Sequence, residues 1–164
     1  PHYGFASSPL VAGGVLVVQI GAGTGQAIAG FDVATGARRW TAGDDTVQYQ
    51  SPVLLRLGSR EIVVAAGATR LTGLDPATGG VLFHHPHGGV PGDISVSSAV
   101  PVPAGDGRVF LKTHSDGSTM FRLADDAEGR VAVDVLWTAP VMRQTYVVPV
   151  YYDGHLYGMN GGRS

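Results

Sequence analysis

The stretch GFDVATGARRW (Gly30–Trp40) returns in altered form as GLDPATGGVLF (Gly73–Phe83), 43 residues later. Both copies keep an aspartate, a Thr-Gly pair and a large aromatic residue at the end. A Ser-Pro pair shows the same offset, from Ser8-Pro9 to Ser51-Pro52. Because three separate markers share one spacing, the chain is built from an internal repeat, and this repeat decides the fold.

Two further copies are less regular. SSAVPV, starting at Ser97, takes the place of the Ser-Pro pair in the third copy. There, Arg122 replaces the aspartate, a longer loop is expected in place of the Asp-Thr-Gly turn, and Trp137 takes the aromatic position. A fourth copy begins with VVPVYYDGHLYGMNGG, residues 147–162, and stops before its own turn.

Each unit reads as four short strands. The strands are rich in Val, Leu and Ile and are bounded by Gly, Asp and Pro, whereas no window shows the apolar spacing of a helix. Repeat units of about 43 to 50 residues with four strands each are typical of propeller blades. The predicted fold class is therefore all-β, a β-propeller fragment of about three and a half four-stranded antiparallel blades. We expect one incomplete domain over residues 1–164, with units at roughly 6–49, 50–96, 97–146 and 147–164.

The repeated turn has a packing explanation. The Asp32 carboxylate can accept backbone N–H groups just beyond it, Thr35 can add a hydroxyl hydrogen bond, and Gly36 can adopt the positive φ that closes the hairpin. The returning strand then places Trp40 between neighbouring blades. The residues expected to have this structural role are Asp32, Thr35, Gly36, Trp40, Asp75, Thr78, Gly79, Phe83 and Trp137.

Composition excludes several functional classes. With 44% hydrophobic and 15% charged residues, the 164-residue chain is typical of a packed globular protein. A net charge of −2 gives no electrostatic footprint for nucleic acid. The absence of cysteine excludes disulfides, thiolate zinc sites and cysteine nucleophiles.

The segment Leu10–Gly30 carries no charge over 21 residues and has the length of a membrane span. Its six glycines, two glutamines and one threonine make it poorly suited to lipid, so no membrane span is expected. Its second half, GAGTGQAIAG, resembles a dinucleotide-binding loop but lacks the third glycine and the following helix. Both features favour a glycine-rich β-hairpin.

Three histidines, His84, His85 and His87, lie close together, and His114 or His155 from neighbouring units could join them around a metal ion. No acidic residue lies within five positions of His87, and Pro86 with the Gly88-Gly89 pair favours a loop between blades. We therefore expect neither a bound metal nor turnover from this segment.

Other candidates for chemistry also have simpler structural interpretations. The acidic pairs Asp44-Asp45 and Asp125-Asp126 could serve acid–base catalysis or calcium binding, but adjacent strand residues point to opposite faces and aspartate is favoured in turns. The serines fit no G-x-S-x-G elbow. The tyrosines of the last unit favour strand packing over a base-stacking platform; they are Tyr146, Tyr151, Tyr152 and Tyr157. No catalytic, cofactor-binding or metal-ligating residue is assigned, and no cofactor.

With these motifs the chain resembles the quinoprotein-type (pyrroloquinoline-quinone-like) β-propeller repeat family. GFDVATGARRW is similar to that family's tryptophan-docking motif, whereas Phe83 in the second copy and Arg122 in the third depart from it. The resemblance implies a ring of about six to eight blades. It also implies, for the family's dehydrogenases, an acidic calcium-binding set, a stacking tryptophan and often a vicinal disulfide. None of that catalytic set is recognisable in this sequence.

The resemblance favours a non-catalytic propeller scaffold or binding module outside the cytoplasm, periplasmic or secreted, with no enzyme activity. The partner of such a scaffold would be another protein or the remaining blades of the same propeller. No nucleic acid is expected as a partner. The alternative is a fragment of a quinone-dependent dehydrogenase whose cofactor site lies mostly outside this segment. A third possibility is a domain that presents the substrate of another domain. We expect exposed apolar faces at both ends, with Leu10, Val15 and Val17 at one end and Val148, Val150 and Leu156 at the other.

Overall fold

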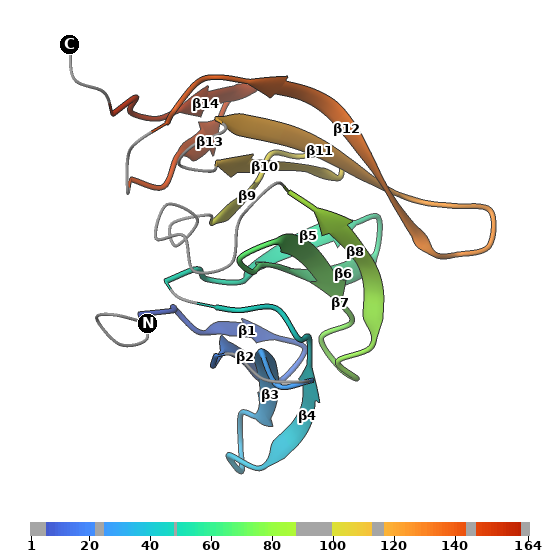
Figure 1. Ribbon diagram of the computed structural model, residues 1–164. Helices are drawn as coiled ribbons and strands as arrows, with labels where there is room; N and C mark the ends of the chain where they lie inside the picture. Colours follow the sequence, from blue (N-terminus) through green and yellow to red (C-terminus); the bar gives the residue numbers. More distant parts are fainter. Residues whose placement is uncertain are drawn as a thin grey trace.

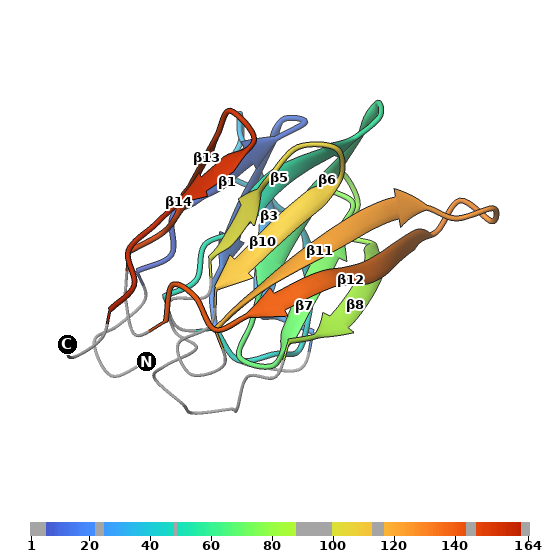
Figure 2. The ribbon, with the colours of Figure 1, turned by 90° about the horizontal axis from the view of Figure 1, so that it is seen from above.

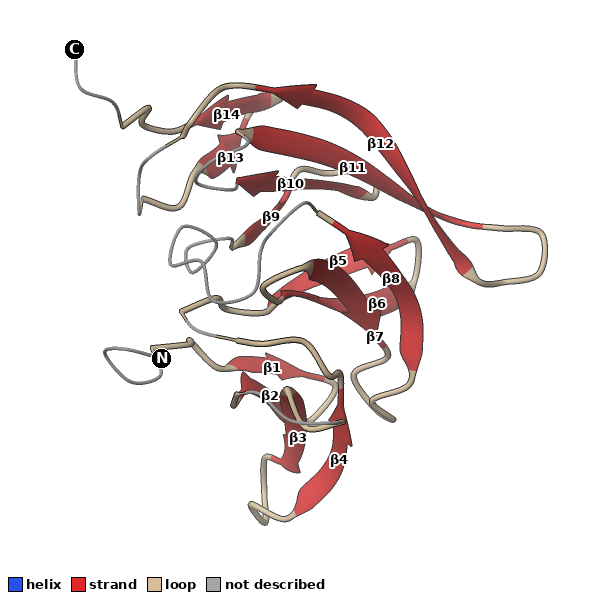
Figure 3. Cartoon of the chain, in the orientation of Figure 1, coloured by secondary structure: helices blue, strands red, loops and turns tan. Residues whose placement is uncertain are grey.

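The structure is a computed structural model and describes residues 6–21, 25–47, 49–87, 100–112, 117–143 and 147–161. The described residues form fourteen β-strands joined by turns and loops, with no helix among them (Figure 3). Consequently, none of the described residues forms a helix long and apolar enough to cross a membrane.

The strands form three four-stranded antiparallel sheets and one two-stranded sheet, and each sheet follows chain order. Blade 1 contains β1 (Leu10–Ala12), β2 (Val15–Gln19), β3 (Ile28–Asp32) and β4 (Arg38–Ala42). Blade 2 contains β5 (Val53–Leu57), β6 (Arg60–Ala66), β7 (Arg70–Leu74) and β8 (Val81–Pro86). Blade 3 contains β9 (Pro101–Pro103), β10 (Arg108–Lys112), β11 (Ser118–Asp125) and β12 (Val131–Ala139). The half-blade contains β13 (Val150–Tyr152) and β14 (His155–Tyr157).

The blades stack face to face and fan out from one edge (Figure 1). The first strands of successive blades contact one another, β1 with β5, β5 with β9 and β9 with β13, and the last strands β4, β8 and β12 lie on the opposite edge. Seen from above, the sheets lie side by side with their strands in similar directions (Figure 2). This arrangement confirms the predicted all-β propeller fragment.

The hydrophobic core is divided between the blade interfaces. One cluster joins blades 1 and 2 and includes Val17, Trp40 and Val63. A second joins blades 2 and 3, around Phe83 and Phe121, and a third joins blade 3 to the half-blade. Because each cluster draws its members from two sheets, the apolar faces of neighbouring blades stabilise each other.

The expected exposure of Val15 and Val17 is wrong. Both side chains are fully buried, because alternate residues of β2 point towards blade 2 and join the first cluster. Leu10 is half-buried against the same cluster. At the other end Val148 and Val150 are exposed, as expected, whereas Leu156 packs on blade 3.

The segment Leu10–Gly30, which the sequence predicts to be a hairpin and not a membrane span, contains β1, β2 and part of β3. Strands β2 and β3 pair antiparallel, with Val17 opposite Gly30. The predicted hairpin is therefore confirmed for the described part of this segment.

The third hairpin differs from the sequence prediction. In place of a longer loop it has longer strands, β11 and β12, which pair as far as Asp125 opposite Val131. Asp126, and not the position of Arg122, begins the tight turn, and the Asp126 amide donates to the Arg130 carbonyl at 2.8 Å. The extended hairpin projects beyond the other two (Figure 1).

Candidate functional site: the surfaces between blades

The turns after β3 and β7 form the same hydrogen-bond network. Oδ1 of Asp32 accepts from the amides of Ala34 (3.0 Å) and Thr35 (2.8 Å) and from the Thr35 hydroxyl (2.9 Å). Oδ1 of Asp75 accepts from the amides of Ala77 and Thr78 (2.9 Å each) and from the Thr78 hydroxyl (3.0 Å). These are the turn hydrogen bonds expected from the repeated Asp-x-x-Thr motif.

Two glycines close these turns in the left-handed region. Gly36 has a φ of 72° and Gly79 a φ of 71°. Their amides donate to the carbonyls of Asp32 at 2.8 Å and Asp75 at 2.9 Å. A side chain at either position would be strained, which explains why the repeat keeps glycine there.

The charge on Asp32 is also stabilised locally. Hydrogen bonds from the Thr35 amide and hydroxyl, together with the Arg39 guanidinium, lower the pKa of Asp32 to about 2. Nη2 of Arg39 lies 2.6 Å from Oδ2 of Asp32. Both oxygens of this carboxylate therefore have partners within blade 1.

The three aromatic positions share one register. Trp40 pairs with Gly30, Phe83 with Gly73 and Trp137 with Met120, and a β-bulge follows each pair immediately. The bulge is therefore part of the repeat, and it aims the aromatic side chain of the last strand.

Glycine is required opposite the first two rings. A Cβ on Gly30 would lie 2.2 Å from a ring carbon of Trp40, and one on Gly73 would lie 2.0 Å from a ring carbon of Phe83. Each ring therefore lies flat across the backbone of the neighbouring strand. Sequence analysis missed this role, although both glycines stand two positions before the repeated aspartate.

Trp40 also joins blade 1 to the turn of blade 2. Its Nε1 donates to the Pro76 carbonyl at 3.1 Å, and a Cβ on Gly79 would lie 2.5 Å from its ring. The Trp40 side chain is 9% exposed. The indole thus uses both its apolar face and its N–H group at the interface.

Phe83 and Trp137 have different environments. Phe83 is buried in the cluster between blades 2 and 3. Trp137 is 40% exposed, with its ring centroid 6.0 Å from that of Phe110. Trp137 lies on the face of blade 3 against which the half-blade packs, and its expected role between blades stays a prediction. Met120 replaces the glycine opposite it, and the described part of the half-blade has no turn equivalent to that of blade 2.

The histidines have separate partners. Nδ1 of His84 lies 3.1 Å from the Thr72 hydroxyl, Nδ1 of His85 lies 2.7 Å from the Pro86 carbonyl, and Nε2 of His87 lies 3.0 Å from the Gly67 carbonyl. Nδ1 of His155 contacts the Asp153 carbonyl, and His114 lies outside the described residues. Within the described ranges no three His, Asp or Glu side chains are grouped as metal ligands.

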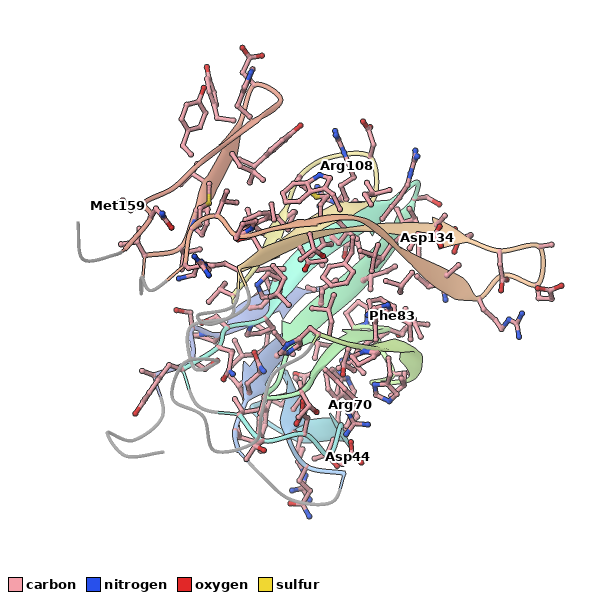
Figure 4. The ribbon with its side chains drawn as sticks, turned by 45° about the horizontal axis from the view of Figure 1, so that its top comes forward. Asp44, Arg70, Phe83, Arg108, Asp134 and Met159 are labelled. Atoms are coloured by element: carbon pink, nitrogen blue, oxygen red, sulfur yellow. The ribbon has the colours of Figure 1, made fainter. Side chains whose placement is uncertain are left out.

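The acidic pair Asp44-Asp45 forms polar contacts with blade 2. Oδ2 of Asp45 accepts from the amides of Thr69 and Arg70, both at 2.8 Å. Asp44 forms an ion pair with Arg70, and Figure 4 shows these two side chains pointing towards one another. Asp45 was expected to bond within its own turn. Its Oδ1 does accept from the adjacent Thr46 amide at 2.9 Å, and its Oδ2 additionally connects the segment after blade 1 to the β6–β7 loop.

The second acidic pair also has protein partners. Asp125 forms an ion pair with Arg60 of blade 2 at 3.0 Å, and Asp126 binds Arg130 at 2.9 Å. The amides of Glu128 and Arg130 donate to Oδ1 of Asp126. Asp126 thus forms a turn network similar to that of Asp32.

The repeated serine lies at a blade interface. The Ser8 amide donates to Oγ of Ser51 at 2.9 Å, so the two Ser-Pro copies contact each other. This geometry favours a structural interpretation of the repeated serines.

Two polar residues occupy equivalent buried positions at the ends of second strands. Gln19 and Lys112 are 3% and 1% exposed. Nε2 of Gln19 donates to the Ala66 carbonyl of blade 2 at 2.9 Å, whereas its Oε1 has no hydrogen-bond partner among the described residues. Burial lowers the pKa of Lys112. Sequence analysis did not single out either residue.

Comparison with known proteins agrees with the repeat. The sequence model of a family described as outer membrane protein assembly factor BamB matches residues 3–162. The chain belongs to this family. The quinoprotein-type resemblance of its repeats is thereby confirmed. The search of curated proteins found no match to this chain.

Among solved structures, 22 chains match. One is a europium-containing methanol dehydrogenase, with 14% sequence identity and a TM-score of 0.48. The match covers 80% of the BamB-family chain described here and 25% of the dehydrogenase chain. The chain thus spans about a quarter of the length of that structure.

Proposed function

We propose that this chain forms part of a non-catalytic β-propeller that acts as a scaffold or binding module, in the assembly role that the family description names. We also propose that it works outside the cytoplasm, as its family membership suggests. Residues 1–164 form a single incomplete propeller domain in this proposal, with units at roughly 6–49, 50–96, 97–146 and 147–164.

The observation that carries the proposal is the use of the repeated residues. Asp32 and Asp75 are engaged by turn amides, and Asp45 by the amides of blade 2. The aromatic residues Trp40 and Phe83 pack between sheets. The repeated aspartates therefore close hairpin turns and the repeated aromatic residues pack between blades, which supports a structural role for these residues.

The exposed face of the half-blade supports a binding role. Val150 pairs with Tyr157 and Tyr152 pairs with His155, so these four side chains share the face that points away from blade 3. Val150 is 61% exposed, Tyr152 70% and Tyr157 56%. Such a group of exposed apolar side chains is typical of a surface covered by another protein surface. In this proposal it packs on a further blade or on a protein partner.

A ligand titration distinguishes this function from its main alternative. Pyrroloquinoline quinone is titrated into the purified full-length gene product by calorimetry, with calcium chloride in excess. The scaffold proposal predicts no saturable heat and no reduction of an electron-acceptor dye when alcohols are added. Stoichiometric quinone binding followed by dye reduction would contradict it and favour a quinone-dependent dehydrogenase.

A further inference from the structure

The outer edge of blade 3 differs from the outer edges of the other two blades. Strand β12 is nine residues long, whereas β4 has five residues and β8 has six. Outer strands are commonly protected from strand addition by charged side chains or by proline. Strand β4 contains Arg38 and Arg39, and β8 ends at Pro86. Strand β12, with the sequence VAVDVLWTA, has no lysine, arginine or proline, and its one charged residue is Asp134.

The register of β12 determines which of its backbone groups point outward. At the end of the hairpin the Asp126 amide donates to the Arg130 carbonyl at 2.8 Å, so this pair is hydrogen-bonded. Hydrogen-bonded and non-hydrogen-bonded pairs alternate in an antiparallel ladder, so the pairs with β11 that contain Val133 and Val135 are non-hydrogen-bonded. The amide of Leu123, which lies opposite Val133, accordingly donates to the β9–β10 turn on its other side, at 2.8 Å. The N–H and C=O groups of Val133 and Val135 therefore point away from the sheet.

These outward groups are open in the part of the chain that the structure describes. Strand β12 is the last strand of its sheet, and no described segment hydrogen-bonds to the backbone of Val133 or Val135 from outside. Val135 is 51% exposed and Leu136 is 44% exposed. This edge lies opposite the edge where the first strands of successive blades meet (Figure 1). Because neighbouring blades pack on sheet faces, a further blade leaves this edge open.

We propose that β12 binds an extended segment of a partner protein as a fifth strand of blade 3, and that this segment carries a lysine or arginine opposite Asp134. The backbone of the segment hydrogen-bonds to Val133 and Val135, and its β-branched side chains pack beside theirs. This inference rests on the proposed scaffold function, because it names a surface on which the scaffold holds its partner.

The charge of Asp134 selects the basic residue. Three acidic residues at the tip of the same hairpin form ion pairs with arginines: Asp125, Asp126 and Glu128. Asp134, labelled in Figure 4, is exposed and lies opposite Arg122 in the register, but it forms no ion pair with any described residue. Because it stands between Val133 and Val135, it would form a non-hydrogen-bonded pair with an added strand, in which the two side chains are closest. Opposite charges stabilise such a pair, and like charges destabilise it.

A second copy of this chain fits the edge less well. In a two-fold antiparallel pairing of β12 with itself, the position of the symmetry axis fixes which residue lies opposite Asp134. An axis at Val133 places Ala132 there, and an axis at Val135 places Leu136 there. An axis at Asp134 brings the two carboxylates together. None of these arrangements supplies a cation, so the occupant is a partner that brings its own basic residue.

The test uses the full-length gene product and two fluorescein-labelled synthetic peptides. In both peptides valine alternates with threonine, and the central threonine is replaced by lysine in one and by glutamate in the other. Fluorescence anisotropy measures the Kd of each peptide. Val135→Pro removes an outward N–H group but no hydrogen bond to β11. Val81→Pro is the matched control, because Val81 has the same place before the bulge in the outer strand of blade 2.

The lysine peptide should bind the parent protein about fivefold more tightly than the glutamate peptide, because only the lysine peptide neutralises Asp134. Val135→Pro should raise the Kd of the lysine peptide about tenfold, whereas Val81→Pro should leave it unchanged. Asp134→Lys should reverse the order of the two peptides. Circular dichroism checks that each variant folds. If Val135→Pro does not fold, the reversal by the exposed substitution Asp134→Lys still decides the question.

Three results would overturn the inference. The first is the absence of saturable binding of either peptide, and the second is an unchanged peptide order in Asp134→Lys. The third is an equal loss of binding in Val135→Pro and Val81→Pro. If the peptides do not bind and the parent protein forms dimers that Val135→Pro abolishes, the occupant is a second copy, and the inference is again wrong. The quinone titration reads out the proposed function separately, so failure of that function and failure of this inference are distinguishable.

Discussion

The indole of Trp40 lies on Gly79, the glycine that closes the turn of the neighbouring blade. A Cβ on Gly79 would lie 2.5 Å from a ring carbon of Trp40, and Nε1 of Trp40 donates to the Pro76 carbonyl at 3.1 Å. This pair joins the repeated turn to the repeated aromatic position. It explains why the two motifs occur together in one stretch of sequence.

Substitution of Trp40 tests the contribution of this contact to stability. Trp40→Ala should lower the free energy of unfolding by about 3–5 kcal/mol, because it leaves a cavity between blades 1 and 2. Trp40→Phe keeps most of the ring but loses the hydrogen bond to Pro76, and should lower it by about 1–2 kcal/mol. Urea unfolding followed by circular dichroism measures both. Equal losses for the two variants would show that the hydrogen bond, and not ring packing, dominates.

The glycine opposite the ring gives a second prediction. Gly30→Ala should destabilise the chain by about 1–3 kcal/mol, because the new methyl group would overlap the Trp40 ring. In a Trp40→Ala background the same change should cost far less, because the ring is gone. Additive losses in this double-mutant cycle would rule out the ring as the cause.

The lowered pKa of Asp32 predicts a pH dependence. Because its folded-state value is about 2, below its ordinary value of 3.8, the ionised carboxylate stabilises the folded state. That contribution is complete above about pH 4 and is lost as the pH falls towards 2. Asp32→Asn should therefore be less stable than the parent chain at neutral pH, and the difference should shrink between pH 4 and 2. A difference that stays constant over this interval would contradict the assignment.

Asp45 and Asp44 form a matched pair of substitutions. Asp45→Ala removes the acceptor of two amides in blade 2 and should cost about 1–3 kcal/mol. Asp44→Ala breaks only an exposed ion pair with Arg70 and should cost less than about 1 kcal/mol. Chemical unfolding of the two variants side by side checks the order. A larger loss at Asp44 would show that the ion pair, and not the amide bridge, joins these segments.

Much of the fold was predictable because its signals are local. The 43-residue offset, the short β-branched runs and the Asp-x-x-Thr-Gly turns led to four-stranded sheets in sequence order. The turn network of Asp32 could be predicted because all its donors lie within seven residues of it.

The features that could not be predicted from the sequence concern which neighbouring surface a side chain contacts. Val15 and Val17 were placed on an exposed face because strand alternation separates two faces without saying which one meets the next blade. Trp137 has the same register as Trp40, but its 40% exposure could not be predicted, because it depends on Met120 and on what covers blade 3. The bridge from Asp45 to Thr69 and Arg70 joins residues at least 24 positions apart, and no local pattern marks it.

We propose that both outer faces of this stack are surfaces for packing on further blades or partners. Sedimentation velocity of the 164-residue chain over a wide concentration range tests it most directly. We predict self-association that grows with concentration and is weakened by Tyr152→Lys and Tyr157→Lys, because these tyrosines are exposed on the open face of the half-blade. A monodisperse monomer at all concentrations that unfolds cooperatively would contradict the account.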